Sequence, residues 1–210
     1  MKNPTTPSST LPTTIWLPDA DEPNPAPIPG AVLPAWALDR IRTDFSRRPA
    51  HAPARLLKMA VRDSRPGMDA RIPVTAFTTA TREATTSGTP SLLLAELHPD
   101  ALPTFTDELP TPTATLDDGW PGFFHRTHRL LPSHGLLLLA TRQRRDAGHL
   151  TDPLGTLIAT ARTAGFRYLQ HLVVVYGRPR DNHLVATPPA DASRGVVHCD
   201  LIALAAIHHT

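Results

Sequence analysis

The stretch Leu131-Pro-Ser-His-Gly-Leu-Leu-Leu-Leu-Ala140 decides how the C-terminal half of the chain folds. Its proline and glycine end whatever helix precedes them, and the continuous apolar run 136–140 is typical of a strand buried on both faces in a parallel sheet. Upstream, residues 120–131 place Phe123 and Phe124 among apolar residues at helical spacing. The order helix, turn and buried strand therefore predicts an α/β fold.

The elements that follow can be placed from capping residues and prolines. After a polar loop, 141–151, Asp152 and Pro153 predict the start of a helix that Gly165 ends. Two strands then follow, at 168–176 and 196–207, and the connection between them contains too much proline for a crossover helix. We expect these two strands to pair antiparallel within a mostly parallel sheet that has helices on both faces.

The N-terminal residues 1–33 are rich in Pro, Thr and Ser and predict a flexible, extended or disordered arm. Within the arm, Trp16 has two interpretations: an aromatic anchor that docks on its own domain, which is the more common outcome, or a cover for a ligand. Residues 34–210 then form one α/β domain, with a first helix at 34–47. Further strands are expected at 55–61, 72–77 and 91–97, with a weak, Thr-rich helical signal between the last two.

Composition agrees with a single-domain cytoplasmic protein. The chain has 210 residues and one cysteine, Cys199, so it forms no intrachain disulfide. Its start lacks the pattern of a signal peptide, and it contains no apolar stretch long enough for a bilayer. The net charge of +2 is too small to argue for a nucleic-acid partner by itself.

A family resemblance rests on the segments just described. Phe124-His-Arg-Thr-His-Arg-Leu-Leu-Pro-Ser-His-Gly135, the strand that follows it, the helix 152–165 and the final strand 196–204 resemble the end of a Rossmann-like class I S-adenosylmethionine-dependent methyltransferase. The likeness is to actinobacterial proteins related to the DNA amino-methyltransferases, and it covers a little under half of the chain. It implies a methyltransferase sandwich with an antiparallel C-terminal hairpin strand, S-adenosylmethionine as cofactor and DNA as partner.

The cofactor loop of that family departs from its pattern here. The family places a glycine-rich loop after the first strand, where the backbone must approach the cofactor. This chain has Val61-Arg-Asp-Ser-Arg-Pro-Gly67, with a single glycine. The resemblance makes Asp63 and Gly67 the candidate cofactor-binding residues, and a simple polar turn is the alternative.

The catalytic motif departs as well. DNA amino-methyltransferases carry Asp, Asn or Ser, then Pro-Pro and an aromatic, at the end of the strand that corresponds to 91–97, and the aromatic stacks on the flipped base. Here the sequence is Leu97-His-Pro-Asp100, so one proline remains and the aromatic is absent. Glu96, His98, Pro99 and Asp100 are the candidate catalytic residues, because carboxylates and imidazole can accept a proton. The alternative is a turn with a solvated acid.

The loop after strand 136–140 is the candidate partner site. Arg142, Arg144 and Arg145 follow the C-terminal end of a parallel strand, where open α/β sheets bind ligands, and guanidinium groups suit phosphates or an acidic protein surface. A solvated loop is the alternative. His125 and His128 lie one helical turn apart without a third ligand at matching spacing, so we predict no metal site.

Two functions follow from these features. The chain is either a degenerate methyltransferase-like domain that binds nucleic acid or another protein without a cofactor, or an active S-adenosylmethionine-dependent methyltransferase that acts on DNA or another nucleic acid. The departures in both motifs favour the degenerate domain. Neither a membrane nor a particular oligomeric state is indicated.

Overall fold

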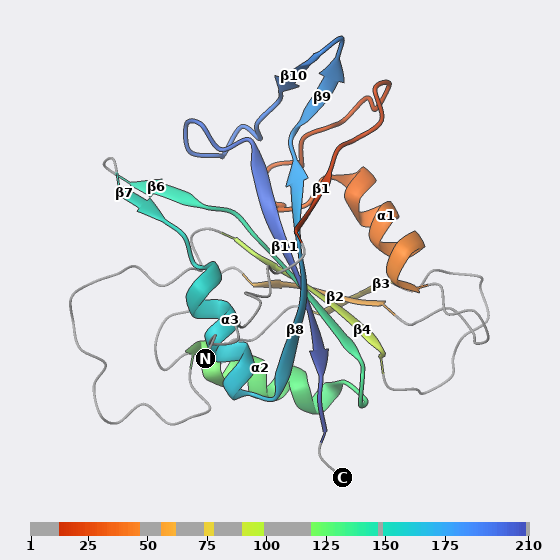
Figure 1. Ribbon diagram of the computed structural model, residues 1–210, viewed down its shortest axis with the longest axis vertical. Coiled ribbons are helices and arrows are strands. Elements are labelled where there is room, and N and C mark those ends of the chain that lie inside the picture. The colour runs from red at the N-terminus through yellow and green to blue at the C-terminus, as the bar shows by residue number, and fades with distance from the viewer. Residues whose placement is uncertain are drawn as a thin grey trace, which may run out of the picture.

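A computed structural model describes residues 13–46, 56–61, 74–77, 90–98, 119–146 and 149–208. Its centre is a seven-stranded sheet with the order β1-β8-β11-β5-β4-β2-β3 (Figure 1). The strands of this sheet are β1 (Thr13–Trp16), β2 (Leu56–Val61), β3 (Val74–Phe77), β4 (Leu92–Leu97), β5 (Leu136–Thr141), β8 (Phe166–Val175) and β11 (His198–Ala206). The helices are α1 (Ala35–Ser46), α2 (Gly119–Leu130) and α3 (Leu154–Thr163). No helix in the described part of the chain is long and apolar enough to cross a membrane.

The antiparallel pairing predicted for the last two long strands is confirmed, because β8 and β11 pair antiparallel along their whole length. The sheet as a whole is mixed: five of its seven strands run in one direction, and β11 and β3 run in the other. β11 lies inside the sheet and is antiparallel to β5 as well as to β8, and β3 is antiparallel to β2. The parallel pairs are β1 with β8, β2 with β4, and β4 with β5.

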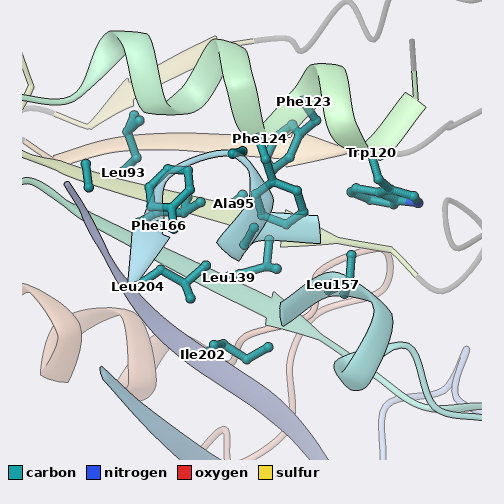
Figure 2. Packing of buried hydrophobic residues seen from close by; sticks show 14 of the residues in the cluster. Leu93, Ala95, Trp120, Phe123, Phe124, Leu139, Leu157, Phe166, Ile202 and Leu204 are labelled. Atoms are coloured by element: carbon teal, nitrogen blue, oxygen red, sulfur yellow. The ribbon is translucent and has the colours of Figure 1, made fainter. Parts of the chain in front are cut away.

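Both faces of the sheet are covered, which explains the continuous apolar runs in β4 and β5. Alternate residues of a strand point to opposite faces. One set packs under α2 and α3, as Figure 2 shows for Leu93, Ala95 and Leu139, and the other set packs under α1 and the N-terminal segment. A strand buried on both faces needs apolar side chains at every position, as these two strands have.

Aromatic rings pack α2 against the sheet. Phe124 meets Phe166 at the start of β8 edge to face, with ring centroids 6.2 Å apart (Figure 2). The turn between α2 and β5 is tight: the Gly135 N–H donates to Pro132 O at 2.8 Å, and a Cβ at position 135 would lie 2.9 Å from that same oxygen. Glycine is therefore required where the sequence predicts the helix to stop.

The segment predicted as a flexible arm is an ordered part of the domain from Thr13 onward. β1 extends the sheet by pairing parallel with β8. Trp16 is buried against Phe45 of α1, and the Arg40 guanidinium carbon lies 4.6 Å from the centroid of its ring. Trp16 thus occupies the position of an anchor on its own domain.

Two connections predicted as loops contain hairpins instead. β6 (Arg144–Asp146) and β7 (His149–Thr151) pair antiparallel between β5 and α3. β9 (Gly177–Arg180) and β10 (His183–Ala186) do the same between β8 and β11. Because β5 and β8 run in the same direction, both hairpins leave the sheet at the same end (Figure 1). These strands have only three or four residues each, too few to show a hydrophobic periodicity that would distinguish them from loops.

The C-terminal end of α3 agrees with the prediction, whereas at its start Pro153 and not Asp152 is the N-cap residue, and Asp152 binds the first helical amide. The Leu154 N–H donates to Asp152 Oδ1 at 3.0 Å at the start of the helix. After its end, Gly165 adopts a left-handed conformation with φ of +94°. Both features fix the direction in which the chain enters and leaves this helix.

Candidate functional site

A polar cluster lies where β4 and β5 end side by side. The two strands are parallel, with Leu97 in register with Thr141, so the residues that follow them meet at one edge of the sheet. On the α1 side this edge carries Glu96 and Arg142, and both are buried. The C-terminal edge of parallel strands is where open α/β sheets bind ligands, which makes this cluster the candidate functional site.

Glu96 is bound by the N-terminal segment of its own chain. Only 5% of its surface is exposed. Its Oε2 accepts hydrogen bonds from the backbone N–H of Val32 at 2.9 Å and of Leu33 at 3.3 Å. A carboxylate in an apolar interior needs donors of this kind, and here two consecutive amides provide them.

Arg142 forms a bidentate ion pair with Asp191. Its Nη1 and Nη2 donate to Oδ1 and Oδ2 at 3.2 and 3.0 Å, and the arginine is 1% exposed. The Gly30 N–H and His98 Nε2 also lie near Asp191 Oδ2, at 3.3 and 3.5 Å. The hydrogen bonds from Arg142 hold the pKa of Asp191 well below its usual range.

Tyr176 and Cys199 complete the cluster in the interior. The Tyr176 hydroxyl donates to Val32 O at 2.5 Å, next to the amide that binds Glu96. Burial raises the pKa of Tyr176 well above its usual value, and burial likewise raises the pKa of the Cys199 thiol. Cys199 therefore stays protonated and is a poor nucleophile.

The shape of the N-terminal segment explains how it reaches these groups. The Ala31 N–H donates to Ile28 O at 3.0 Å, which closes a turn with Pro29 and Gly30 at its centre. Gly30 has φ of +79°, as the third residue of a type II turn requires. The turn directs the amides of Gly30, Val32 and Leu33 towards the two carboxylates. We call residues 30–33 the latch.

Three of the candidate residues predicted from the sequence meet in this cluster: Glu96, His98 and Arg142. Arg142 does not share a solvated loop with the other two arginines, because its side chain is buried in the pair with Asp191. Arg144 and Arg145 belong to β6 of the hairpin. The remaining candidates, Asp63, Gly67, Pro99 and Asp100, lie outside the described residues.

Sequence reasoning missed Asp191, Tyr176 and the latch. Asp191 lies in a proline-rich connection far from Arg142 in the sequence, and no spacing indicates that the two pair. Pro29-Gly30 is a recognisable turn signal, but it does not reveal which side chains the turn contacts. Of the helical histidines, His128 stacks on His208 with ring centroids 4.2 Å apart, and its Nε2 lies 3.0 Å from Ile207 O, so it contributes to packing.

The chemistry available at this edge is recognition by hydrogen bonds and charge. Within the described ranges, no group of three or more His, Cys, Asp or Glu side chains is arranged to hold a metal ion. Both latch amides donate to one oxygen of Glu96, Oε2, so a ligand that binds this oxygen has to displace them. Comparison of the chain with protein-family models finds no match, and a search of curated proteins finds no significant relative.

Proposed function

We propose that this chain is a degenerate methyltransferase-like domain that binds a nucleic acid or another protein and does not transfer methyl groups. The observation that carries the proposal is the occupation of Glu96 by the latch. The edge at which a methyltransferase of the resembled class binds its substrate amine is, in this chain, closed by its own backbone amides.

The arrangement of strands supports the methyltransferase-like part of the proposal. The resemblance implies parallel strands followed by an antiparallel C-terminal strand. β2, β4 and β5 run parallel, and β11 is inserted antiparallel beside β5. This agreement in strand direction supports the proposed likeness of fold, but a fold does not by itself give activity.

The residues that follow β2, β4 and β5 support the proposed loss of methyl transfer. The loop after β2 has one glycine where the family has several, and the residues after β4 lack the stacking aromatic. Arg142, which follows β5, is held by Asp191 and is therefore committed to an internal ion pair. The buried guanidinium of Arg142 would lose its charged partner if Asp191 were displaced, so this bidentate pair is poorly suited to exchange with a substrate.

The hairpins support the binding part of the proposal. β6 carries Arg144 and Arg145, and β9 carries Arg178 and the exposed Arg180, at the same end of the sheet (Figure 1). Arginine is the residue best matched to phosphate oxygens because its planar fork donates two parallel hydrogen bonds. Nucleic acid is therefore the first partner to test.

Titration of the full chain with S-adenosylmethionine by calorimetry tests the proposal. We expect no binding tighter than about 1 mM, which corresponds to roughly 4 kcal/mol. The same titration with S-adenosylhomocysteine serves as the control for product-like binding. Micromolar affinity for either compound would overturn the proposal.

The alternative, an active methyltransferase, is favoured by one feature: His98 and Asp191 place an imidazole and a carboxylate 3.5 Å apart just after β4. Such a pair can accept a proton from a substrate amine. Transfer of a labelled methyl group from S-adenosylmethionine to DNA or RNA, lost on changing His98 to Ala, would establish this alternative.

A further inference from the structure

A two-stranded ribbon, β9 and β10, projects from one end of the sheet (Figure 1). Its strands pair antiparallel with Arg180 in register with His183, and a two-residue turn joins them. Residues 180–186 are all exposed, and neither hydrophobic cluster of the domain includes any residue of the ribbon. The ribbon therefore contributes little to the core, and its side chains are accessible to a partner.

Hydrogen bonds hold the base of the ribbon on the domain. The Tyr176 N–H donates to Val197 O at 2.7 Å, and the Thr187 N–H donates to Tyr176 O at 2.9 Å. Arg178 Nη2 donates to Pro23 O of the N-terminal segment at 2.6 Å. These bonds fix the direction in which the ribbon points, and side chains that recognise a ligand are positioned best by a rigid element of this kind.

The two faces of the ribbon differ in chemistry. Residues opposite each other in an antiparallel pair share a face, and alternate residues of one strand point to opposite faces. One face, which we call the basic face, carries Arg178, Arg180, His183 and Val185, and the other carries Gly177, Pro179, Leu184 and Ala186. The basic face contains no acidic residue, so its charge is complementary to that of a nucleic acid.

The turn adds a carboxylate and an amide, Asp181 and Asn182, to the end of the ribbon. An ionised aspartate only accepts hydrogen bonds, an asparagine accepts and donates them, and an arginine only donates them. Phosphates alone, or the acidic surface of a protein, would attract Arg180 and repel Asp181. The edges of base pairs in the major groove present donors as well as acceptors, including the cytosine amino group, which suits a carboxylate. The end of the ribbon is therefore better matched to base edges than to a purely anionic surface.

The shape and composition of the ribbon distinguish between kinds of nucleic acid. The major groove of B-DNA is about 12 Å wide and admits a two-stranded ribbon. In duplex RNA the major groove is too deep and narrow for side chains to read. Single strands are bound largely by stacking of their bases on aromatic rings, and the ribbon contains no Phe, Tyr or Trp. Duplex DNA is therefore the nucleic acid that the ribbon fits.

We propose that the β9–β10 ribbon reads the sequence of duplex DNA from the major groove. The basic face lies towards the base edges, where Arg180 donates two hydrogen bonds to O6 and N7 of a guanine. Arg144 and Arg145 belong to the other hairpin at the same end of the sheet and supply contacts with phosphates. This inference rests on the proposed function, and it deepens that function by naming duplex DNA as the partner and the ribbon as the part that reads its bases.

Selection of binding sequences from a library of random DNA duplexes, carried out with the full chain, is the first step of the test. Each guanine of the selected duplex is then replaced in turn by 7-deazaguanine, which lacks the N7 acceptor but leaves every phosphate in place. We expect one replacement to weaken binding to the parent about tenfold, because one hydrogen bond of the bidentate pair is lost. The same replacement should leave binding to Arg180→Ala unchanged. The salt slope of the parent should be the same for both duplexes, since the phosphate contacts are the same.

Arg167→Ala is the matched control, because it removes the same charge from an exposed residue at the other end of the sheet, and it should keep the tenfold loss. Equal affinity of the parent for all the duplexes, or an equal loss in the parent and in Arg180→Ala, would overturn the proposal. A library that binds without enrichment of any sequence would also contradict it, while nucleic-acid binding in the proposed function would stand. If the library does not bind even at low salt, the nucleic-acid part of the proposed function fails as well.

Discussion

At the scale of single residues, the interior of this domain is unusual for the number of ionisable groups that it holds near one edge of the sheet. Glu96, Arg142 and Asp200 all have buried side chains. Buried charges persist in proteins when they are paired or neutralised. Each of the three has a partner within the chain: the backbone amides of Val32 and Leu33 for Glu96, Asp191 for Arg142, and His171 for Asp200.

The latch should contribute measurably to stability through Glu96. Glu96→Gln removes the negative charge that two amides share, while the shape of the side chain is kept. We expect a loss of about 1–3 kcal/mol in the free energy of unfolding, measured by urea denaturation. Glu22→Gln, which alters a carboxylate near the surface, is the control and should change stability by less than about 0.5 kcal/mol. Equal stabilities for the parent and Glu96→Gln would mean that the latch amides do not depend on this carboxylate.

Asp191 should make the domain sensitive to acid. Its pKa is lowered by Arg142, so its stabilising contribution is present above the unfolded value of about 3.9 and is lost as pH falls below it. In Asp191→Asn, we expect a shallower fall in the urea midpoint between about pH 5 and pH 3 than in the parent. If the two profiles are parallel over that range, Arg142 does not hold Asp191 ionised.

At the scale of elements, replacing either of two glycines in and after α3 by alanine should change the stability of the domain, in opposite directions. Gly155 lies within the helix and has open space where the Cβ of an alanine would lie, so Gly155→Ala should stabilise by roughly 0.5–1 kcal/mol. Gly165 has a left-handed backbone, and a Cβ there would lie 2.8 Å from His128 Nε2. Gly165→Ala should therefore destabilise by more than about 1 kcal/mol. Thermal unfolding of both variants distinguishes the two effects, and a shift of the same sign in both would contradict the described end of α3.

The β6–β7 hairpin should carry part of any nucleic-acid affinity. The double change Arg144→Ala and Arg145→Ala is expected to lower the salt slope of DNA binding by up to about two units, one for each phosphate neutralised. Arg142 is left intact because its removal would leave Asp191 without its main partner. Binding is measured by fluorescence anisotropy across a range of salt concentrations.

The control for this experiment removes the same charge elsewhere. Arg162 in the last turn of α3 and Arg167 at the start of β8 are exposed and lie at the other end of the sheet. The double change Arg162→Ala and Arg167→Ala should leave the salt slope nearly unchanged. If both double variants lose affinity equally, the attraction is a property of net charge and not of the hairpin.

At the scale of the whole molecule, the sequence predicts the framework well and the contacts between distant segments poorly. The apolar run 136–140, the start of α3 and Gly165 have local physical causes, so their positions in the structure agree with the prediction. The antiparallel pairing of β11 with β8 agrees with the prediction made from the prolines in the connection between them. The mixed character of the sheet depends on which strand lies next to which, and no local pattern encodes that.

In the candidate site, too, the residues near strand ends are predicted from the sequence, whereas their contacts with distant segments are not. Glu96 and His98 are chosen from the sequence as proton acceptors at the end of one strand and Arg142 because it follows another, and the structure brings the three to one edge. Their partners come from the latch and from Asp191, separated from them by tens of residues, and a single sequence carries no signal for such pairs. For this reason Arg142 is interpreted from the sequence as a surface group, although its side chain lies inside the protein.

The pairing of β1 with β8 has a consequence for how the protein is made. Among the described strands β1 is synthesised first, yet its neighbour in the sheet, β8, is synthesised only after α3, and β5 likewise is synthesised before its neighbour β11. Chains that end before β11 therefore expose the edge of β5 and the apolar side chains that pack against β8 and β11 in the folded domain. Such intermediates are prone to aggregate, so we expect the nascent chain to depend on chaperones until β11 has been synthesised.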